Sequence, residues 1–224
     1  MSIILNIDTS IEVASVSIAK DGIIQAYLIN TIQKEHASFL HNAVKQLLAE
    51  SALNIKQLDA IAVTNGPGSY TGLRVGLASA KGFCYALNKP LITIGTLNAL
   101  AVAAINALKE TFRETTLFCP MIDARRMEVY TAIFDKNMVE ILPPSAMILD
   151  ERSFEQFLQN NKVFFTGTGA AKWANIARSE NAGFINELDI KAAISTLSFK
   201  KFLTEDFTGL TYSEPLYIKE FFSP

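Results

Sequence analysis

A glycine-rich stretch, Asn65-Gly66-Pro67-Gly68-Ser69-Tyr70-Thr71-Gly72, is the strongest chemical signal in the sequence. It follows a β-like run over residues 58–64 and opens a helix-like run that continues to about residue 87. Free backbone N–H groups at such a strand-to-helix turn can bind a phosphate, and the helix dipole assists them. Small residues at helical spacing can instead let a second helix approach closely. The stretch therefore predicts either an anion site or a docking surface.

The helix opened by this stretch carries Gly72, Gly76 and Ala80 at a spacing of four, which places them on one ridge. A glycine inside a helix costs about 1 kcal/mol relative to alanine, so two on one ridge indicate close packing. The packing partner is either the protein's own sheet or a helix of another protein, and the residue types leave both open. Ser69 is predicted to be the N-cap of the helix rather than a nucleophile, because its surroundings do not form GxSxG.

Asp8, Thr9 and Ser10 follow an apolar, strand-like run over residues 3–7. An aspartate at the end of a buried strand could hold a metal ion through water, while the two hydroxyls meet a phosphate. A turn whose side chains bond to the local backbone is an equally good interpretation.

Two turns in the second half could complete a nucleotide site. Asp123-Ala124-Arg125 lies between two predicted strands, but a phosphate-binding turn of the actin type needs a glycine there for close backbone approach. Gly167-Thr168-Gly169 precedes a predicted helix and could admit a base or ribose. A single GxG is weak evidence, and a plain turn is its commoner meaning.

The two histidines, His36 and His41, lie in one predicted helix over residues 34–50. Metal-binding pairs on a helix need a spacing of three or four, whereas a spacing of five rotates the second ring by roughly 140°. Glu35 cannot complete a ligand set on that face, so we predict neither a metal nor a cofactor.

These residues are positioned by elements that repeat along the chain. Each half reads as three strands, a helix, a strand, a glycine turn and a helix, and an acidic residue ends each first strand. The predicted strands are 3–7, 13–19, 23–29, 58–64, 91–94, 116–122, 127–134, 138–148 and 163–166; the helices are 34–50, 70–87, 96–110, 152–159 and one after 169. Strands alternating with helices predict an α/β protein with partly parallel sheets.

Two such halves predict a duplicated fold with a cleft between two lobes, residues 1–97 and 98–224. The pattern weakens from residue 183 onward. Residues 210–224 are predicted to be a terminal segment docked onto the body.

Composition excludes several classes of protein. The chain has 224 residues, half of them apolar, and a net charge of −2, which argues against disorder and against autonomous binding of nucleic acid. Arg125-Arg126 and Lys200-Lys201 are the only adjacent basic pairs in the sequence, and Arg125, Arg126 and Lys200 are the candidate RNA contacts. Two isolated cysteines, no basic leader and no apolar run of about 20 residues predict a soluble cytoplasmic protein without a membrane segment.

Four motifs together resemble the TsaB/YeaZ family, and the match runs from residue 3 to about residue 219. They are Ile7-Asp8-Thr9-Ser10, the block from Asn65 to Arg74, Ile122-Asp123-Ala124-Arg125 and Pro215-Leu216-Tyr217-Ile218. The GPGSYTGLR block is highly specific, and the others support it. The resemblance implies two RNase-H-like lobes of the actin, Hsp70 and sugar kinase (ASKHA) superfamily.

The resemblance also implies a function. Members of this family are the non-catalytic partners in bacterial synthesis of threonylcarbamoyladenosine on tRNA. Their paralogue TsaD carries the metal and transfers the threonylcarbamoyl group to the adenosine beside the anticodon, and the P-loop ATPase TsaE binds to the pair. The family subunit pairs through helices that include the one opened by the glycine block, and it forms homodimers when alone. We expect tRNA to be met only through the complex.

The implied sites follow from these roles. No catalytic residue is expected here. The expected partner interface comprises Ser69, Tyr70, Gly72, Leu73, Val75, Gly76, Ser79 and Ala80. A vestigial nucleotide cleft would comprise Asp8, Thr9, Ser10, Asp123, Arg125, Gly167 and Gly169.

Departures from the paralogue favour the partner role. TsaD uses a His-x-x-x-His metal motif in the helix equivalent to residues 34–50, and here His41 comes one position too late. We therefore expect Gly72 and Gly76 to meet the partner, so that Gly76→Leu separates the complex without unfolding the chain. The alternatives are a metal-dependent glycoprotease, which would need bound metal, and an autonomous ATPase, which would need ATP binding and turnover.

Overall fold

The first sheet is built around β1 (Ile3–Asp8), an apolar central strand that is buried from Ile4 onward. The structure is a computed structural model that describes residues 1–32, 35–108 and 112–219. The sheet has the order β3-β2-β1-β4-β5. On one side, β2 (Ala14–Lys20) pairs antiparallel with β1, and β3 (Ile23–Asn30) pairs antiparallel with β2. On the other side, β4 (Ala60–Gly66) pairs in parallel with β1, and β5 (Leu91–Gly95) pairs in parallel with β4.

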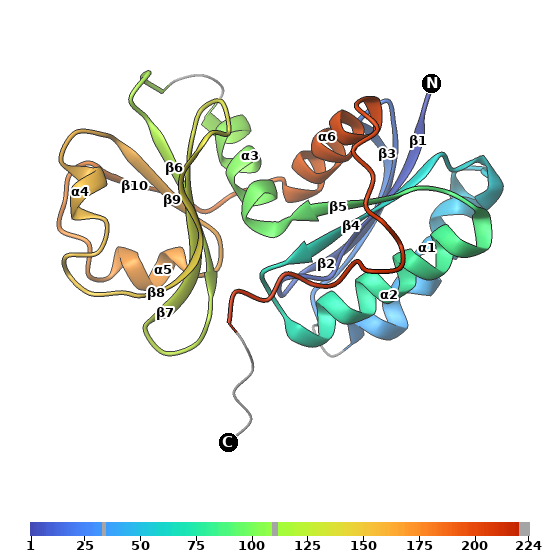
Figure 1. Cartoon of the computed structure of the whole chain (residues 1–224), viewed down its shortest axis with the longest axis horizontal. Coiled ribbons are helices and arrows are strands. Elements are labelled where there is room, and N and C mark those ends of the chain that lie inside the picture. Colours follow the sequence, from blue (N-terminus) through green and yellow to red (C-terminus); the bar gives the residue numbers. More distant parts are fainter. Residues whose placement is uncertain (33–34, 109–111, 220–224) are drawn as a thin grey trace. The chain divides into compact units, whose positions relative to one another are not determined.

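Helices cover both faces of this sheet. On one face α1 (His36–Glu50) and α2 (Tyr70–Leu87) lie side by side and pack on Leu5 and Ile7 of β1 (Figure 1). Asn6, between those two residues, points to the opposite face, since side chains alternate along a strand. There it meets α6 (Ile190–Leu203).

The second sheet repeats this topology in the order β10-β9-β6-β7-β8. On one side of the central β6 (Leu117–Asp123), β7 (Glu128–Asp135) pairs with it antiparallel, and β8 (Glu140–Ile148) pairs antiparallel with β7. On the other side, β9 (Val163–Thr166) pairs with β6 in parallel, and β10 (Ala182–Ile185) pairs in parallel with β9. One face packs on α3 (Thr96–Leu108) through Leu97 and Leu100. The other face packs on α4 (Glu155–Leu158) and α5 (Ala170–Ala174).

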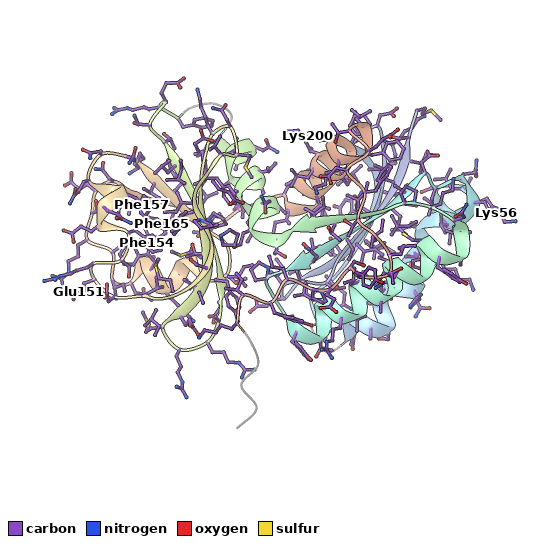
Figure 2. All side chains as sticks on the ribbon, viewed as in Figure 1. Lys56, Glu151, Phe154, Phe157, Phe165 and Lys200 are labelled. Carbon is purple, nitrogen blue, oxygen red and sulfur yellow. The ribbon has the colours of Figure 1, made fainter. Side chains whose placement is uncertain are left out.

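The aromatic side chains under α4 and α5 form the core of that layer. Phe154 lies edge-on to Phe165 and Trp173, with ring centroids 5.2 and 5.3 Å away. Figure 2 shows Phe154, Phe157 and Phe165 together on the inner side of α4, while Glu151 points outward. These contacts hold two short helices that have little stability of their own.

The two compact units are not consecutive in sequence. The first comprises Met1–Thr96 and Lys191–Leu216, and the second comprises Leu97–Ile190 and the residues from Tyr217 onward. The prediction placed all of 98–224 in one lobe and is wrong for 191–216. In α6, Ser195 Oγ donates to the Gly22 carbonyl (2.8 Å) and Ser198 Oγ donates to Asn6 Oδ1 (2.6 Å), so this helix belongs to the first sheet.

The C-terminal segment also packs on the first unit. The N–H of Thr208 donates to the Leu91 carbonyl (2.8 Å), and the N–H of Leu216 donates to the Asn65 carbonyl (2.7 Å). Residues 210–216 of the predicted docked segment therefore reach the end of β4, whereas Tyr217 and the residues after it belong to the second unit. None of the helices within the described residues is both long and apolar enough to span a membrane.

The nine predicted strands are present, whereas β10, α6 and the 3-10 turn η2 (Ile55–Gln57) were not specifically predicted. The predicted helix over 152–159 is shorter, because α4 begins only at Glu155. Residue 34 and residues 109–110, predicted as helix ends, fall outside the described residues.

Candidate functional site

The glycine-rich turn leaves β4 at Gly66 and enters α2 at Tyr70. Ser69 is the N-cap, as predicted, and its Oγ accepts from the Gly72 N–H at 3.3 Å. The Ser69 N–H donates to the Ser10 carbonyl at 2.7 Å. Two N–H groups that a phosphate cradle would offer are thus already bonded within the protein.

The glycines of this turn and helix accommodate the Thr9-Ser10 turn of their own unit. A Cβ on Gly68 would overlap the Ser10 carbonyl, and one on Gly72 would overlap the Thr9 carbonyl. A Cβ on Gly76 would overlap Thr9 Oγ1, the hydroxyl that donates to the Gly72 carbonyl at 2.7 Å. The ridge therefore packs on the protein's own sheet.

This packing corrects the predicted interface. Gly72, Leu73, Gly76 and Ala80 are buried inside the first unit, so the expectation that Gly72 and Gly76 meet a partner is wrong. For the same reason Gly76→Leu cannot leave the fold intact. The other four predicted residues do reach the surface: Tyr70 is exposed, and Ser69, Val75 and Ser79 are half-buried.

The exposed side of α2 carries a second row of small residues. Ala78, Gly82 and Ala86 are exposed, four residues apart, and no atom lies within 4 Å of a Cβ built on Gly82. Tyr85 stands beside them with 86% of its surface exposed. We call Ala78, Gly82, Tyr85 and Ala86 the outer α2 face; its spacing was readable in the sequence, but its exposure was not.

A groove adjoins this face where α1 meets α2. His41 Nε2 lies 3.2 Å from Ser79 Oγ, and its ring centroid lies 5.5 Å from that of Phe83. The groove has a volume of about 410 Å³ and is lined by His41, Val44, Lys45, Leu48, Leu53, Asn54, Ile55 and Phe83. Sequence reasoning considered His41 only as a metal ligand and missed this location.

Asp8 is buried at the end of β1 and is satisfied internally. Its Oδ1 accepts from the Ser10 N–H (2.9 Å), from Ser10 Oγ (2.6 Å) and from Thr64 Oγ1 (2.7 Å). The structure thus brings Asp8, Thr9 and Ser10 together as a turn that anchors α2. Of the two interpretations from sequence, the local turn is the one observed.

The second unit holds the remaining predicted cleft residues. Asp123 Oδ1 accepts from the Arg125 N–H (2.6 Å) and from Lys172 Nζ (2.7 Å). Partial burial raises the pKa of Asp123, but the hydrogen bond from Lys172 and the one from the Arg125 N–H outweigh it and lower the pKa. Lys172 lies 49 residues after Asp123, and no sequence pattern indicated that the two would form an ion pair.

The Gly167-Thr168-Gly169 turn packs against β6. Gly167 has φ +89°, and a Cβ there would overlap the Met121 carbonyl, which also accepts from the Gly169 N–H at 3.1 Å. Thr168 Oγ1 accepts from the Asp123 N–H at 3.0 Å. These contacts are those of a plain turn that secures the strand.

The histidines differ in environment. His36 is buried, with Nε2 3.2 Å from the Glu12 carbonyl, whereas His41 is exposed. Within residues 1–32, 35–108 and 112–219, no three His, Cys, Asp or Glu side chains are grouped so that they could hold a metal ion.

Comparison with known proteins places the chain in a family. A family profile described as TsaD, tRNA N6-adenosine threonylcarbamoyltransferase, matches residues 29–203. The chain is 28% identical to the tRNA threonylcarbamoyladenosine biosynthesis protein TsaB of Haemophilus influenzae, over 96% of this chain and 93% of that protein. The chain belongs to the family of this profile, in its TsaB/YeaZ branch.

Two further relatives agree. TsaB of Escherichia coli is 28% identical over 96% of this chain and 94% of that protein. The structure of YeaZ from Pseudomonas aeruginosa superimposes with a TM-score of 0.77 at 24% identity, covering 97% of this chain and all of that one. With the sheet order repeated in two units, this match confirms the predicted two-lobe α/β fold.

Proposed function

We propose that this chain takes part in the biosynthesis of threonylcarbamoyladenosine on tRNA as a non-catalytic subunit. In this role it binds and activates the paralogous transferase TsaD, and the ATPase TsaE joins the pair. Without the paralogue, the same surface forms a homodimer. Membership of the TsaB/YeaZ branch and the names of the TsaB relatives support a role in this pathway.

One observation carries the non-catalytic role. The groups that would serve a nucleotide or a metal in this fold are engaged within their own units: Asp8 by Ser10 and Thr64, the glycine turn by Thr9 and Ser10, and Asp123 by Lys172. A polar group that already has its hydrogen-bond partners inside the protein gains little by exchanging them for a ligand.

The outer α2 face supports the partner role. A solvent-exposed glycine in a helix costs about 1 kcal/mol without any benefit to the isolated chain. Small side chains at Ala78, Gly82 and Ala86 let a second helix approach closely, and Tyr85 adds a large apolar anchor. With the half-buried Ser69, Val75 and Ser79 and the exposed Tyr70, this face replaces the buried ridge as the proposed interface.

Reconstitution tests the proposal. Purified TsaD and TsaE from the same organism are mixed with unmodified tRNA, ATP and the threonylcarbamoyl donor system, with and without this chain. We expect modified adenosine to form only when the chain is present, and the chain alone to form none. Equal product without the chain would contradict the activating role, and product from the chain alone would contradict the non-catalytic role.

A further inference from the structure

The turn between β6 and β7 presents two adjacent arginines in an unusual backbone conformation. Arg125 has φ +70° and Arg126 has φ +47°, the left-handed region that glycine and asparagine normally occupy. Both residues are exposed, as is the following Met127. Arginine rarely adopts this backbone conformation, so surrounding contacts must stabilise it at both positions.

Three hydrogen bonds hold this backbone. Asp123 Oδ1 accepts from the Arg125 N–H at 2.6 Å, and the Glu128 N–H donates to the Arg125 carbonyl at 3.0 Å. The Ala124 N–H donates to the Glu128 carbonyl, also at 3.0 Å. The turn is therefore closed at its base, and both arginine Cα atoms lie at its exposed tip.

The carboxylates nearest the tip are already paired with lysines. Asp123 pairs with Lys172, and Glu128 pairs with Lys219. Among the described residues, neither Arg125 nor Arg126 has an ion-pair partner. The six side chains carry four positive and two negative charges, a local excess of two positive charges on a chain whose net charge is −2.

We propose that Arg125 and Arg126 bind phosphates of the RNA backbone when the assembled complex holds its tRNA. The guanidinium group is the side chain best suited to bidentate contact with phosphate oxygens. Such contacts position a nucleic acid without reading its sequence, which suits a subunit that holds an RNA for another subunit's chemistry. This inference rests on the proposed function and adds a direct RNA contact to it.

The test measures the salt dependence of tRNA binding by the assembled complex. Arg125→Gln/Arg126→Gln is compared with wild type and with Lys20→Gln/Lys56→Gln, which removes two exposed charges from the first unit at positions that are not candidate RNA contacts; Figure 2 shows Lys56. Losing two phosphate contacts should reduce the slope of log K against log salt by about 1.5 to 2 and weaken binding roughly tenfold at low salt. Arg125→Lys/Arg126→Lys, which keeps both charges, should retain most of the slope.

Other outcomes separate the explanations. A slope unchanged from wild type, with the complex assembled, overturns the proposal. Weaker assembly with TsaD at an unchanged RNA slope also overturns it and assigns the arginines to an acidic protein surface. If the wild-type complex does not form, the proposed function fails, and tRNA titration of the isolated chain at low salt then tests the arginine site. Binding by wild type that the double Gln variant loses supports the site. Binding that the variant keeps, or no binding by wild type, overturns it.

Discussion

Thr9 determines what the glycines of α2 do. Its carbonyl and hydroxyl occupy the space beside Gly72 and Gly76, and its hydroxyl donates back to the Gly72 carbonyl at 2.7 Å. A side chain on either glycine would push β1 and α2 apart. Close approach between a strand end and a helix start is therefore the physical reason for both glycines.

Alanine substitutions at the inner and the outer glycines of α2 should change the free energy of unfolding in opposite directions. Gly72→Ala places a methyl group against the Thr9 backbone and should lower the free energy of unfolding by about 2 to 3 kcal/mol. Gly82→Ala meets no atom within 4 Å and should raise it by up to about 1 kcal/mol. Urea denaturation measures both, and a Gly72→Ala protein as stable as wild type would contradict the packing described for Thr9.

The two thiols should be unreactive in the native protein. Burial raises the pKa of Cys84 and of Cys119 to about 12, so the nucleophilic thiolate is scarce at neutral pH. Ellman's reagent at pH 8 should label neither thiol until urea unfolds the chain. Because unfolded thiols ionise near pH 8.5, stability should fall as the pH rises from about 8.5 toward 12. Rapid labelling at a rate independent of urea would contradict this burial.

At the scale of elements, α6 is the least expected feature. It is separated from the first sheet by the whole second sheet in sequence, yet it covers the face opposite α1 and α2. Its contacts with that sheet include small and polar groups: Ser198 Oγ donates to Asn6 Oδ1, and Ser195 Oγ donates to the Gly22 carbonyl.

Removing one α6 hydroxyl should destabilise the chain measurably. Ser198→Ala leaves the buried Asn6 Oδ1 without this donor and should lower the free energy of unfolding by about 1 to 3 kcal/mol. Thr196→Ala is the matched control, since Thr196 is exposed and bonds only within α6; its effect should stay below about 0.5 kcal/mol. Equal denaturation midpoints for the two variants would argue against α6 packing on the first sheet.

Sequence patterns predicted some elements well for a physical reason. Large apolar side chains in strands report burial directly, so nine strands were found from runs and alternation. In α6 the buried residues include Ala193, Ser195 and Ser198. Such small and polar residues are also typical of a solvent-exposed helix, so the sequence did not indicate that α6 is packed. The small residues Gly72 and Gly76 predicted close packing correctly, but their partner, Thr9, lies 63 residues before Gly72 and no local pattern points to it.

At the scale of the whole molecule, one sheet order occurs twice. In each repeat, the helix that follows the fifth strand packs on the other repeat's sheet: α3 follows β5 and packs on the second sheet, and α6 follows β10 and packs on the first. Neither half of the sequence corresponds to a complete unit. The repeat was readable in the sequence, whereas this exchange depends on side-chain contacts that no repeat pattern encodes.

The proposed role accounts for features at all three scales. Asp8, Ser10 and Asp123 secure turns, and the outer α2 face is exposed. The tip formed by Arg125 and Arg126, which has no ion-pair partner among the described residues, lies in the second unit. These features fit the proposed role, in which the chain keeps the fold of an enzyme family and uses its surfaces for binding.

The most direct test of this account is the association of Gly82→Leu with TsaD. Gly82 has open space around it, so leucine should leave the chain folded while blocking the approach of a partner helix. Gly209→Leu is the matched control, because Gly209 is also exposed with no atom within 4 Å of a built Cβ. In size-exclusion chromatography with light scattering, we expect wild type and Gly209→Leu to form the complex and Gly82→Leu to elute apart from TsaD. A complex of wild-type affinity with Gly82→Leu would contradict the account.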